Sequence, residues 1–331
     1  MHIAVALAIL LAWQTGAPAQ PGTSFEGRWR LIDRGLTTLP VVEDLIVHET
    51  ESSGTLSVEQ RLPDGVRWIR YTIARHLSAG GRALPYNRAF PNIATWRRDR
   101  LVLETSAAVR TTPGRSDGHE ELWSMAGSDV LAVDITNRSF GGVPRTVRLN
   151  YRRVPRPALT PGQNLVENAG ADAGVASWWH SGEAAVEPCD GDPCFAVRNN
   201  GTFRQTILLP REIAGRYLVI IGSGLSERIN ADGGITGLPY LYALVTATDG
   251  VRITAHLQGM RARPSRTNQW VTLSGVFRMP DDADVLSLQL NQASAGGVAH
   301  DGTAARFDNV GVFAFPTEHE ARAFVERWRG R

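Results

Sequence analysis

Residues 164–172 read Asn-Leu-Val-Glu-Asn-Ala-Gly-Ala-Asp, and residues 305–312 read Ala-Arg-Phe-Asp-Asn-Val-Gly-Val. Between these two segments, apolar and polar residues alternate in short runs with no helical repeat, a pattern that is typical of β-strands. We therefore expect a β-sandwich over residues 163–316, with the two segments as its first and last strands. The alternating runs cover residues 202–209, 215–221, 240–247, 252–257, 269–279 and 285–291.

The same segments carry a resemblance to a known family. The first resembles the Asn-Leu-x-x-Asn-x-Gly opening of CenC-type carbohydrate-binding modules, and Phe307-Asp308-x-Val310 resembles the strand that ends those jelly rolls. Trp270, Leu273, Gly275 and Phe277 stand at the spacing of a further strand of these modules. The resemblance covers about half of the chain. It implies a galactose-binding-like jelly roll that binds a poly- or oligosaccharide without cutting it.

A polar sheet face within this half is the candidate binding surface. In residues 287–291 the leucines point one way and the polar side chains the other, and residues 252–258 split in the same way. Aromatic rings cover the apolar faces of a pyranose, while amides and guanidinium groups pair with its hydroxyls. The alternative is a solvated face with ordinary cross-strand pairs. The predicted ligand-binding residues are Arg204, Tyr240, Tyr242, His256, Gln258, Gln289 and Asn291.

The resemblance also implies a structural calcium ion. Many galactose-binding-like sandwiches hold one where the first and last strands meet, and calcium takes oxygens from carboxylates and backbone carbonyls. Asp172 and Asp308 stand at the matching positions. Simple hydrogen bonding of Asp308 to backbone amides is the alternative.

The first half of the chain shows shorter alternating runs separated by turn residues, which predict about eight antiparallel strands. Phe25-x-Gly27-x-Trp29-x-Leu31 resembles the opening of lipocalin-like barrels. We expect an all-β chain: a lipocalin-like antiparallel barrel over residues 24–154, a proline-rich linker over 155–162, the jelly roll, and a short helix over 317–331. The predicted helix has Ala321, Phe324, Val325 and Trp328 on one face.

The termini and the cysteines point to an exported protein. Residues 3–13 are apolar and precede Ala17-Pro18-Ala19, which fits a signal peptide over residues 1–19 with cleavage near Ala19. Cys189 and Cys194, the only cysteines, are predicted to form a disulfide across an Asp-Gly turn. These features predict a secreted or periplasmic location.

Charge and hydropathy exclude two classes of partner. The formal net charge of +2 is too small to indicate nucleic-acid binding. The arginines are scattered singly, which we interpret as a solvated face. No segment after the leader approaches the roughly 20 apolar residues of a membrane span.

We weigh carbohydrate binding against two other functions. The barrel could hold a small apolar ligand in an internal cavity. Alternatively, the chain could be a glycan-active enzyme, which requires two opposed carboxylates. The sequence nominates no such pair and no other catalytic residue, so we predict that the protein is not an enzyme. Trp178, Trp179 and Trp270 are interpreted as packing residues.

Overall fold

The computed structural model describes most of the chain from residue 24 onward. The predicted signal peptide and its cleavage site lie outside this part. No helix in the described ranges is long and apolar enough to cross a membrane. The described residues are 24–35, 41–50, 55–62, 65–73, 93–97, 100–108, 116–137, 145–229, 235–247, 253–261, 266, 268–293 and 302–329.

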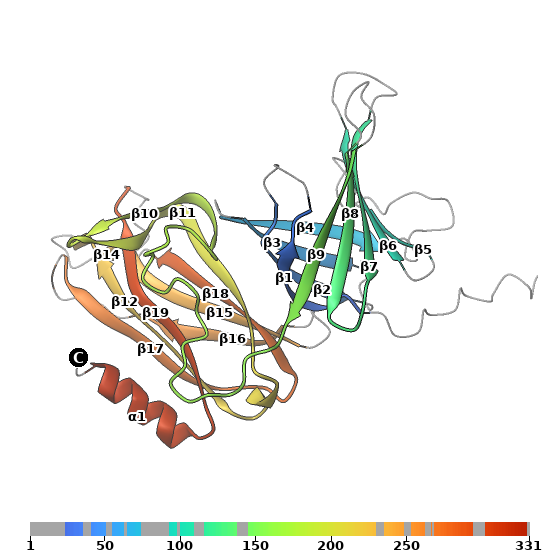
Figure 1. Cartoon of the computed structure of the whole chain (residues 1–331). Coiled ribbons are helices and arrows are strands. Elements are labelled where there is room, and N and C mark those ends of the chain that lie inside the picture. Colours follow the sequence, from blue (N-terminus) through green and yellow to red (C-terminus); the bar gives the residue numbers. More distant parts are fainter. Residues whose placement is uncertain are drawn as a thin grey trace, which may run out of the picture.

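The prediction of an all-β chain is confirmed, and its first part is a closed barrel (Figure 1). Neighbouring strands pair in chain order, and β1 also pairs with β9, which closes the barrel. The strands are β1 (Gly27–Asp33), β2 (Asp44–Thr50), β3 (Thr55–Leu62), β4 (Gly65–Ile73), β5 (Ile93–Arg97), β6 (Arg100–Ala108), β7 (Ser116–Met125), β8 (Val130–Asn137) and β9 (Arg145–Val154).

Within the described residues, the barrel has nine strands where the pattern predicts about eight, and one of its strand pairs is parallel rather than antiparallel. Residues 93–97 form an additional strand, β5, in which Arg97 pairs with Arg100 at the start of β6 and Ile93 pairs with Glu104 in its middle. The contact between β4 and β5 is parallel, through Thr72 with Ile93 and Ile73 with Ala94. A parallel pair needs a crossover connection, which a pattern of hairpins does not predict.

Large aromatic side chains fill the barrel interior where it is described. Trp29 and Trp123 are fully buried there, together with Tyr71 and Tyr151. The indole of Trp29 donates a hydrogen bond to the backbone oxygen of Phe25 at 2.7 Å. The described part of the barrel interior is therefore a packed core, which counts against an apolar ligand bound there.

The second part is a rolled sandwich built on one continuous path of hydrogen-bonded strands, β16-β15-β18-β11-β19-β12-β17. The long strand β11 makes the roll, because residues 202–208 pair with β18 and residues 195–197 pair with β19. The strands are β10 (Trp179–Cys189), β11 (Asp192–Leu208), β12 (Tyr217–Ser226), β13 (Arg228–Ile229), β14 (Ile235–Thr236), β15 (Leu238–Ala247), β16 (Ile253–Met260), β17 (Trp270–Arg278), β18 (Ala283–Ala293) and β19 (Ala305–Phe315), with a 3₁₀ turn at Arg211–Ile213.

The opening segment meets the last strand, although it is not itself a strand. Asn164 forms an isolated bridge with Phe313, and the amide of Leu165 donates to the oxygen of Val312 at 2.8 Å. The Asn164 side chain accepts a hydrogen bond from the amide of Val312 and donates one to the oxygen of Val310. The prediction that residues 164–172 lie beside residues 305–312 is correct. Side-chain hydrogen bonds of Asn164, however, replace most of the backbone hydrogen bonds that a regular strand would form there.

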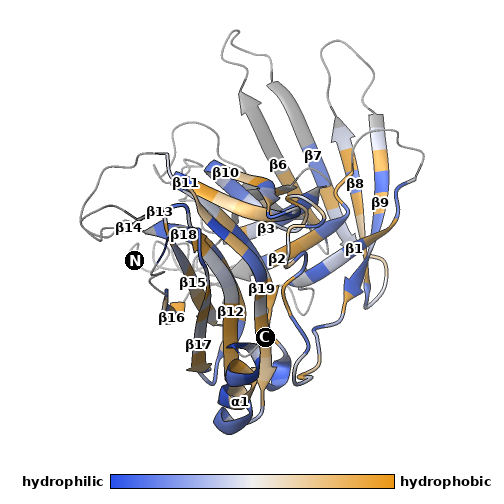
Figure 2. Ribbon diagram, turned by 90° about the vertical axis from the view of Figure 1, so that its left-hand side faces the viewer, coloured by the Kyte–Doolittle hydropathy of each residue, from blue (hydrophilic) through white to orange (hydrophobic). Residues whose placement is uncertain are grey.

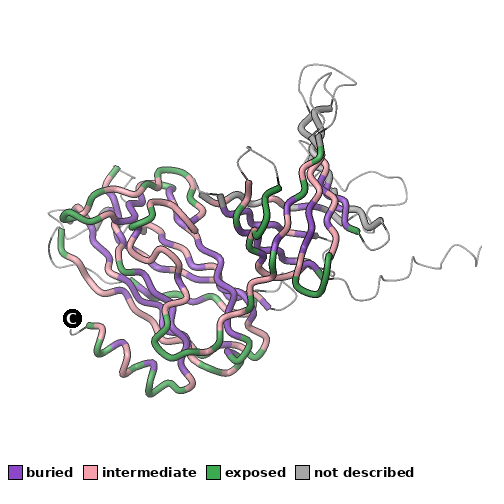
Figure 3. Tube along the Cα trace, viewed as in Figure 1, coloured by how far each residue is buried: buried purple, intermediate pink, exposed green. Residues whose placement is uncertain are grey.

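Alternation along the strands places the apolar residues between the layers of the sandwich. Phe195, Phe203, Leu241, Leu290 and Phe307 are all fully buried in one cluster. Orange and blue alternate along strands such as β8 and β9 of the barrel (Figure 2). Buried residues follow the strands of both parts, whereas buried, half-buried and exposed residues alternate along the C-terminal helix (Figure 3).

The C-terminal helix α1 (Glu318–Arg329) packs on the sandwich as predicted. Thr317 begins it, since its hydroxyl accepts a hydrogen bond from the amide of Glu320 and donates one to that residue's carboxylate. The rings of Phe324 and Trp328 lie 4.6 Å and 5.8 Å from the ring of Phe313.

The barrel packs against the sandwich through charged and apolar groups. Glu167, in the opening segment, accepts hydrogen bonds from Arg28 at 2.5 Å and from Arg61 at 2.6 Å. Arg156 pairs with Asp284 at 2.6 Å. Ile46 of β2 forms a small buried cluster with Leu208 and Val285 of the sandwich.

These contacts correct the interpretation of the arginines as a solvated face. The side chain of Arg61 is only 7% exposed, because it lies between the two parts of the chain. Burial alone would raise the pKa of Glu167, but the charges of Arg61 and Arg28 and their hydrogen bonds more than offset it and lower this pKa to about 2. Glu167 is therefore ionised wherever this contact is intact at neutral pH.

Candidate functional site

Four side chains form a row across the sheet face that points away from the core. Strand pairing places Trp179 beside Arg204, Arg204 beside Gln289, and Gln289 beside Tyr242. The guanidinium of Arg204 lies over the Trp179 ring, 5.3 Å from its centroid. Because neighbouring strands lie roughly 4.8 Å apart, the two aromatic side chains stand about 14 Å apart across β10, β11, β18 and β15. We call these four residues the central row.

A second row lies one pleat along the strands and extends the same surface. Pairing places Ser181 beside Thr202, Thr202 beside Asn291, and Asn291 beside Tyr240. The rings of Tyr240 and Tyr242 lie 6.1 Å apart, and Asn291 donates a hydrogen bond to the side-chain oxygen of Gln289. We call these four residues the outer row.

A third row, on the other side of the central row, comprises Thr206, Ser287, Leu244 and His256. His256 joins it to the central row, because its Nδ1 lies 2.6 Å from the hydroxyl of Tyr242. The three rows together present aromatic rings, amides, hydroxyls, an imidazole and a guanidinium on one face. Such a surface can cover the apolar faces of a sugar and pair with its hydroxyls.

Six of the seven predicted ligand-binding residues lie in these rows. The seventh, Gln258, is exposed in a bulge of β16 opposite Tyr242, where two residues of β16 face one residue of β15. In β11, Arg204 faces the rows, whereas its neighbour Gln205 is buried and bonds to the backbone of Glu167.

Trp179 is the residue of the central row that sequence reasoning missed. Its neighbour Trp178 is fully buried, with its ring 5.0 Å from the ring of Phe195. The prediction of core packing is therefore right for Trp178, whereas Trp179 faces outward and remains half-buried. The alternation of a strand could have given this signal, since adjacent residues of β10 point to opposite faces.

Gly182 explains how β10 presents Trp179 at this position. The strand pairing shifts between Ser181 and Glu183, and Gly182 adopts a left-handed φ of 61° in this bulge. A Cβ atom there would lie 2.8 Å from the backbone oxygen of Asn200. Glycine is therefore required where β10 bends over β11.

The barrel covers one end of the same sheet face. Along β11, Thr206 and Leu208 follow Arg204 on alternate residues, and both are buried. Arg61 of β3 donates a hydrogen bond to the oxygen of Thr206 at 3.0 Å, while Ile46 contacts Leu208. The barrel thus covers the Thr206 end of the third row.

The hollows described at the junction have a different character. Cavities of about 480 Å³ and 320 Å³ lie between the barrel and the sandwich. Their walls carry Arg28 in both, with Arg156 and Asp284 in the larger and Glu167 in the smaller. Arg28 pairs with Glu167 and Arg156 pairs with Asp284 across the junction. The hollows therefore belong to the contact between barrel and sandwich, and we place the candidate site on the three rows.

Asp172 and Asp308 approach each other as predicted. A Cβ atom built on Gly170 would lie 3.3 Å from Asp308 Oδ1 and 3.4 Å from Asp172 Oδ2. Burial raises the pKa of Asp308, and the charge of Asp172 raises it further. Both Asp308 oxygens also accept hydrogen bonds from Asn309. Within the described ranges there is no group of three or more His, Cys, Asp or Glu side chains that could hold a metal ion.

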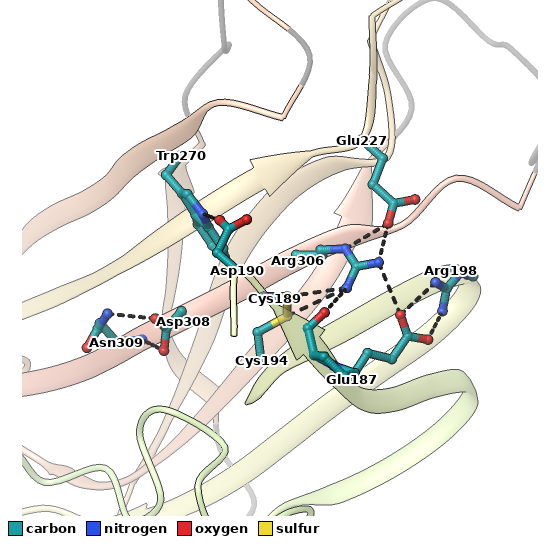
Figure 4. The surroundings of a disulfide bond; sticks show 11 residues. Glu187, Cys189, Asp190, Cys194, Arg198, Glu227, Trp270, Arg306, Asp308 and Asn309 are labelled. Carbon is teal, nitrogen blue, oxygen red and sulfur yellow. Dashed lines mark hydrogen bonds and ion pairs between the residues drawn. A yellow bond between two sulfur atoms is a disulfide. The ribbon is translucent and has the colours of Figure 1, made fainter. Parts of the chain in front are cut away.

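The predicted disulfide between Cys189 and Cys194 is confirmed (Figure 4). Asp190 and Gly191 connect the paired strands with φ values of 52° and 104°, which is the left-handed geometry of a tight hairpin turn. Arg306 crosses beneath the hairpin and pairs with Glu187 and Glu227. This cluster lies at the opposite end of β10 from Trp179.

No family model matches the chain, and no curated protein matches it. Solved structures that share similarity include a xylan-binding CBM22-1 domain of Paenibacillus barcinonensis Xyn10C (14% identity, 48% of this chain and 99% of that one, TM-score 0.35). TmCBM61 in complex with β-1,4-galactotriose is also similar (15% identity, 46% of this chain and 100% of that one, TM-score 0.31). The enzymatically active domain of bacteriophage CBA120 tailspike protein 4 shows 17% identity over 46% of this chain (TM-score 0.33), and the match spans 21% of that domain. Since all three TM-scores are low, we base no functional argument on these likenesses.

Proposed function

We propose that this chain is an exported, non-catalytic carbohydrate-binding protein that binds a poly- or oligosaccharide on the three rows. The observation that carries the proposal is the central row, in which an aromatic ring stands at each end and a guanidinium and an amide lie between them. Aromatic faces bind the C–H surfaces of sugars, and the groups between them are hydrogen-bonding partners for hydroxyls. The separation of the rings suits several sugar units rather than one.

The rows support binding better than hydrolysis. They contain no aspartate or glutamate, whereas hydrolysis of a glycosidic bond uses two carboxylates on opposite sides of the sugar. His256 is bonded to Tyr242, so the imidazole orients a phenol of the site. A binding role needs only these groups.

Export is supported by the disulfide. Disulfides persist in oxidising compartments such as the periplasm and the extracellular space. Together with the leader-like residues 1–19, the bond between Cys189 and Cys194 favours a secreted or periplasmic protein.

Binding of neutral and acidic glycans by the purified chain tests the proposal. We expect at least one glycan to bind, and Tyr242→Ala to weaken that binding by about 1–3 kcal/mol because a half-buried ring is lost from the site. Trp270→Ala is the matched control, since Trp270 lies on β17, outside the rows, and bonds to Asp190. Absence of binding to every glycan, or equal losses in both variants, would reject the proposal.

Calcium at Asp172 and Asp308 stays a prediction that rests on the resemblance. If calcium binds there, millimolar calcium raises the melting temperature of the wild-type chain above its value in EDTA, and Asp308→Asn abolishes the difference. If no calcium binds, Asp308→Asn relieves the repulsion that raises the pKa of Asp308, and calcium has no effect on either protein.

A further inference from the structure

One hydrogen bond joins Tyr242 of the central row to His256 of the third row and bears on how the face meets a sugar, an inference that rests on the proposed function. The hydroxyl oxygen of Tyr242 lies 2.6 Å from Nδ1 of His256, and the two ring centroids lie 6.2 Å apart. Tyr242 is half-buried, whereas His256 is exposed. Within the described part of the chain, neither side chain makes another hydrogen bond.

The pairing of β15 with β16 brings the two side chains together. His256 pairs with Leu244, so it shares a face with Tyr242, which lies two residues earlier in β15. The register of the pairing shifts next to Tyr242, and Gly259 adopts a left-handed φ of 90° in this bulge. The backbone of both strands therefore holds the imidazole beside the phenol.

The two groups can share this hydrogen bond in two ways. In the first, the Tyr242 hydroxyl donates to an unprotonated Nδ1, and in the second, a protonated Nδ1 donates to the Tyr242 oxygen. A neutral imidazole nitrogen is a better acceptor than a phenol oxygen, and a phenol is the better donor. Uncharged His256 therefore favours the first arrangement, with the ring proton on Nε2.

The described strands around His256 supply no carboxylate that could replace the phenol as its partner. The charged side chains of β15, β16, β17 and β18, apart from His256 itself, are Asp284 and Arg278. Asp284 pairs with the arginine of the linker, and Arg278 bonds to a backbone oxygen. Arg261, directly after β16, is exposed, and its charge acts on the other phenol, Tyr240. Within these strands, a second proton on the imidazole is therefore shared with its phenol alone.

We propose that His256 is a positioning residue of the binding face, which holds the Tyr242 hydroxyl as a donor within the protein so that the Tyr242 oxygen accepts a hydroxyl of the sugar. A phenol oxygen that donates its own hydrogen can still accept another. When His256 takes up a second proton, Nδ1 donates to that oxygen, the phenol hydrogen turns towards the ligand, and the acceptor is lost. Neutral glycans should therefore bind the form of the protein in which His256 is uncharged.

Calorimetric titration at several pH values tests the proposal with a ligand that has no ionisable group. The probe is whichever of cellotetraose, xylotetraose and β-1,4-galactotetraose the wild-type chain binds most tightly. We expect the affinity to fall about threefold to tenfold between about pH 8 and pH 5.5, where histidine changes charge, because one hydrogen bond to the sugar is lost. A melting curve at each pH checks that the chain stays folded.

Variants separate positioning from a merely structural role. His256→Asn supplies an amide oxygen that can accept from Tyr242 and cannot titrate, so it should bind nearly as tightly as wild type at pH 8 and lose the pH dependence. His256→Ala should bind about threefold to tenfold more weakly at every pH. Tyr242→Phe should show the same loss, and its combination with His256→Ala no further loss, because the two residues act as a unit. His319→Asn, at an exposed position of α1, is the matched control and should keep the pH dependence.

Nitrogen NMR of the histidine rings tests the direction of the bond without a ligand. The signals that disappear in His256→Asn identify its ring, and at pH 8 we expect Nδ1 to be unprotonated and Nε2 to be protonated. Tyr242→Phe should shift the Nδ1 signal, because its donor is gone. A protonated Nδ1 at pH 8 would overturn the proposal.

The binding outcomes separate this positioning role from the proposed function. An affinity independent of pH, a pH dependence that survives Tyr242→Phe, or an additive loss in the double variant overturns the positioning role while carbohydrate binding stands. Failure of all three neutral probes to bind overturns it as well, and the proposed function falls with it only if acidic glycans also fail.

Discussion

Adjacent tryptophans show how two neighbouring residues acquire opposite roles. Trp178 packs against Phe195 and Phe203 in the core, and its indole donates a hydrogen bond to the backbone oxygen of Asn168. Trp179 stands on the other face beneath Arg204. Trp178 is needed for the fold, whereas Trp179 is available to a ligand.

This division predicts separable effects of substitution. Trp178→Ala should lower the free energy of unfolding by about 3–5 kcal/mol, because it leaves a cavity in the core. Trp179→Ala should cost little stability but weaken glycan binding by about 1–3 kcal/mol. Chemical denaturation and calorimetry measure the two quantities. Loss of stability without loss of binding in Trp179→Ala would contradict the assignment.

Alternation in residues 287–291 and 240–242 predicts which side chains of the site strands share a face, whereas the register that turns Tyr240 and Tyr242 outward comes from the pairing of β15 with β18. The outward tryptophan could not be predicted with the same ease. Its strand reads Trp-His-Ser-Gly-Glu-Ala-Ala-Val-Glu-Pro-Cys, in which glycine, small residues and proline obscure the period of two. When the strand cannot be recognised from the sequence, Trp179 cannot be assigned to either face of the sheet.

At the scale of elements, the hairpin of β10 and β11 has two ends with different tasks. One end carries Trp179, and the other carries the disulfide and the cluster around Arg306. The Cα atoms of the two cysteines lie 5.8 Å apart across a two-residue turn. The bond therefore fixes the turn rather than a distant contact.

Removing the disulfide should affect stability more than binding. In Cys189→Ser combined with Cys194→Ser we expect a loss of about 2 kcal/mol in the free energy of unfolding, the loop-entropy value for so short a ring. Glycan affinity should stay within error, because the site lies at the other end of β10. Denaturation and titration of the double variant check both. A large loss of affinity would show that the hairpin orients Trp179 through its turn.

Two elements illustrate what the sequence could not specify. The opening segment resembles a first strand, yet side-chain hydrogen bonds of Asn164 hold it to β19 in place of a regular ladder. Likewise, the parallel contact of β4 and β5 depends on a crossover that local alternation does not reveal. Local patterns predict strands, whereas pairing between distant segments depends on the tertiary fold.

At the scale of the whole molecule, the barrel and the sandwich meet through Glu167 and the arginines that surround it. Polar residues on the outer face of a barrel strand are normally solvated, so no local pattern indicates that Arg61 is buried and Arg28 partly buried. Their role follows only from the packing of β2 and β3 over the end of β11 and β18. The barrel therefore lies against one end of the sheet face that carries the three rows.

Loss of the carboxylate at this junction should weaken the contact. Glu167→Gln leaves Arg28 and Arg61 facing each other without a shared anion, and we expect a loss of about 1–2 kcal/mol after allowance for the partial exposure of Glu167. Thermal unfolding of the variant measures it, with Glu326→Gln on α1 as an exposed control. A variant as stable as wild type would show that the ion pairs add no net stability.

Acid should lower the stability of the folded protein in two stages. Burial lowers the pKa of His48 from its ordinary 6.5, so the folded protein holds it neutral and loses stability as pH falls below 6.5 and the unfolded chain takes up the proton. The lowered pKa of Glu167 adds stability that is present above pH 4.5 and is lost as pH falls towards about 2. Melting temperatures across this range test both stages, with His48→Gln expected to remove the first. A melting temperature that is constant between pH 7 and pH 3 would contradict this account.

The length of the oligosaccharide that saturates the site tests the central claim most directly. If the ligand spans the central row from Trp179 to Tyr242, the affinity of the intact chain should rise from monosaccharide to about the trisaccharide or tetrasaccharide, as the ring separation of about 14 Å requires. Trp179→Ala and Tyr242→Ala should each remove part of that gain. An affinity that does not depend on length, or that neither substitution changes, would place the binding site elsewhere on the protein.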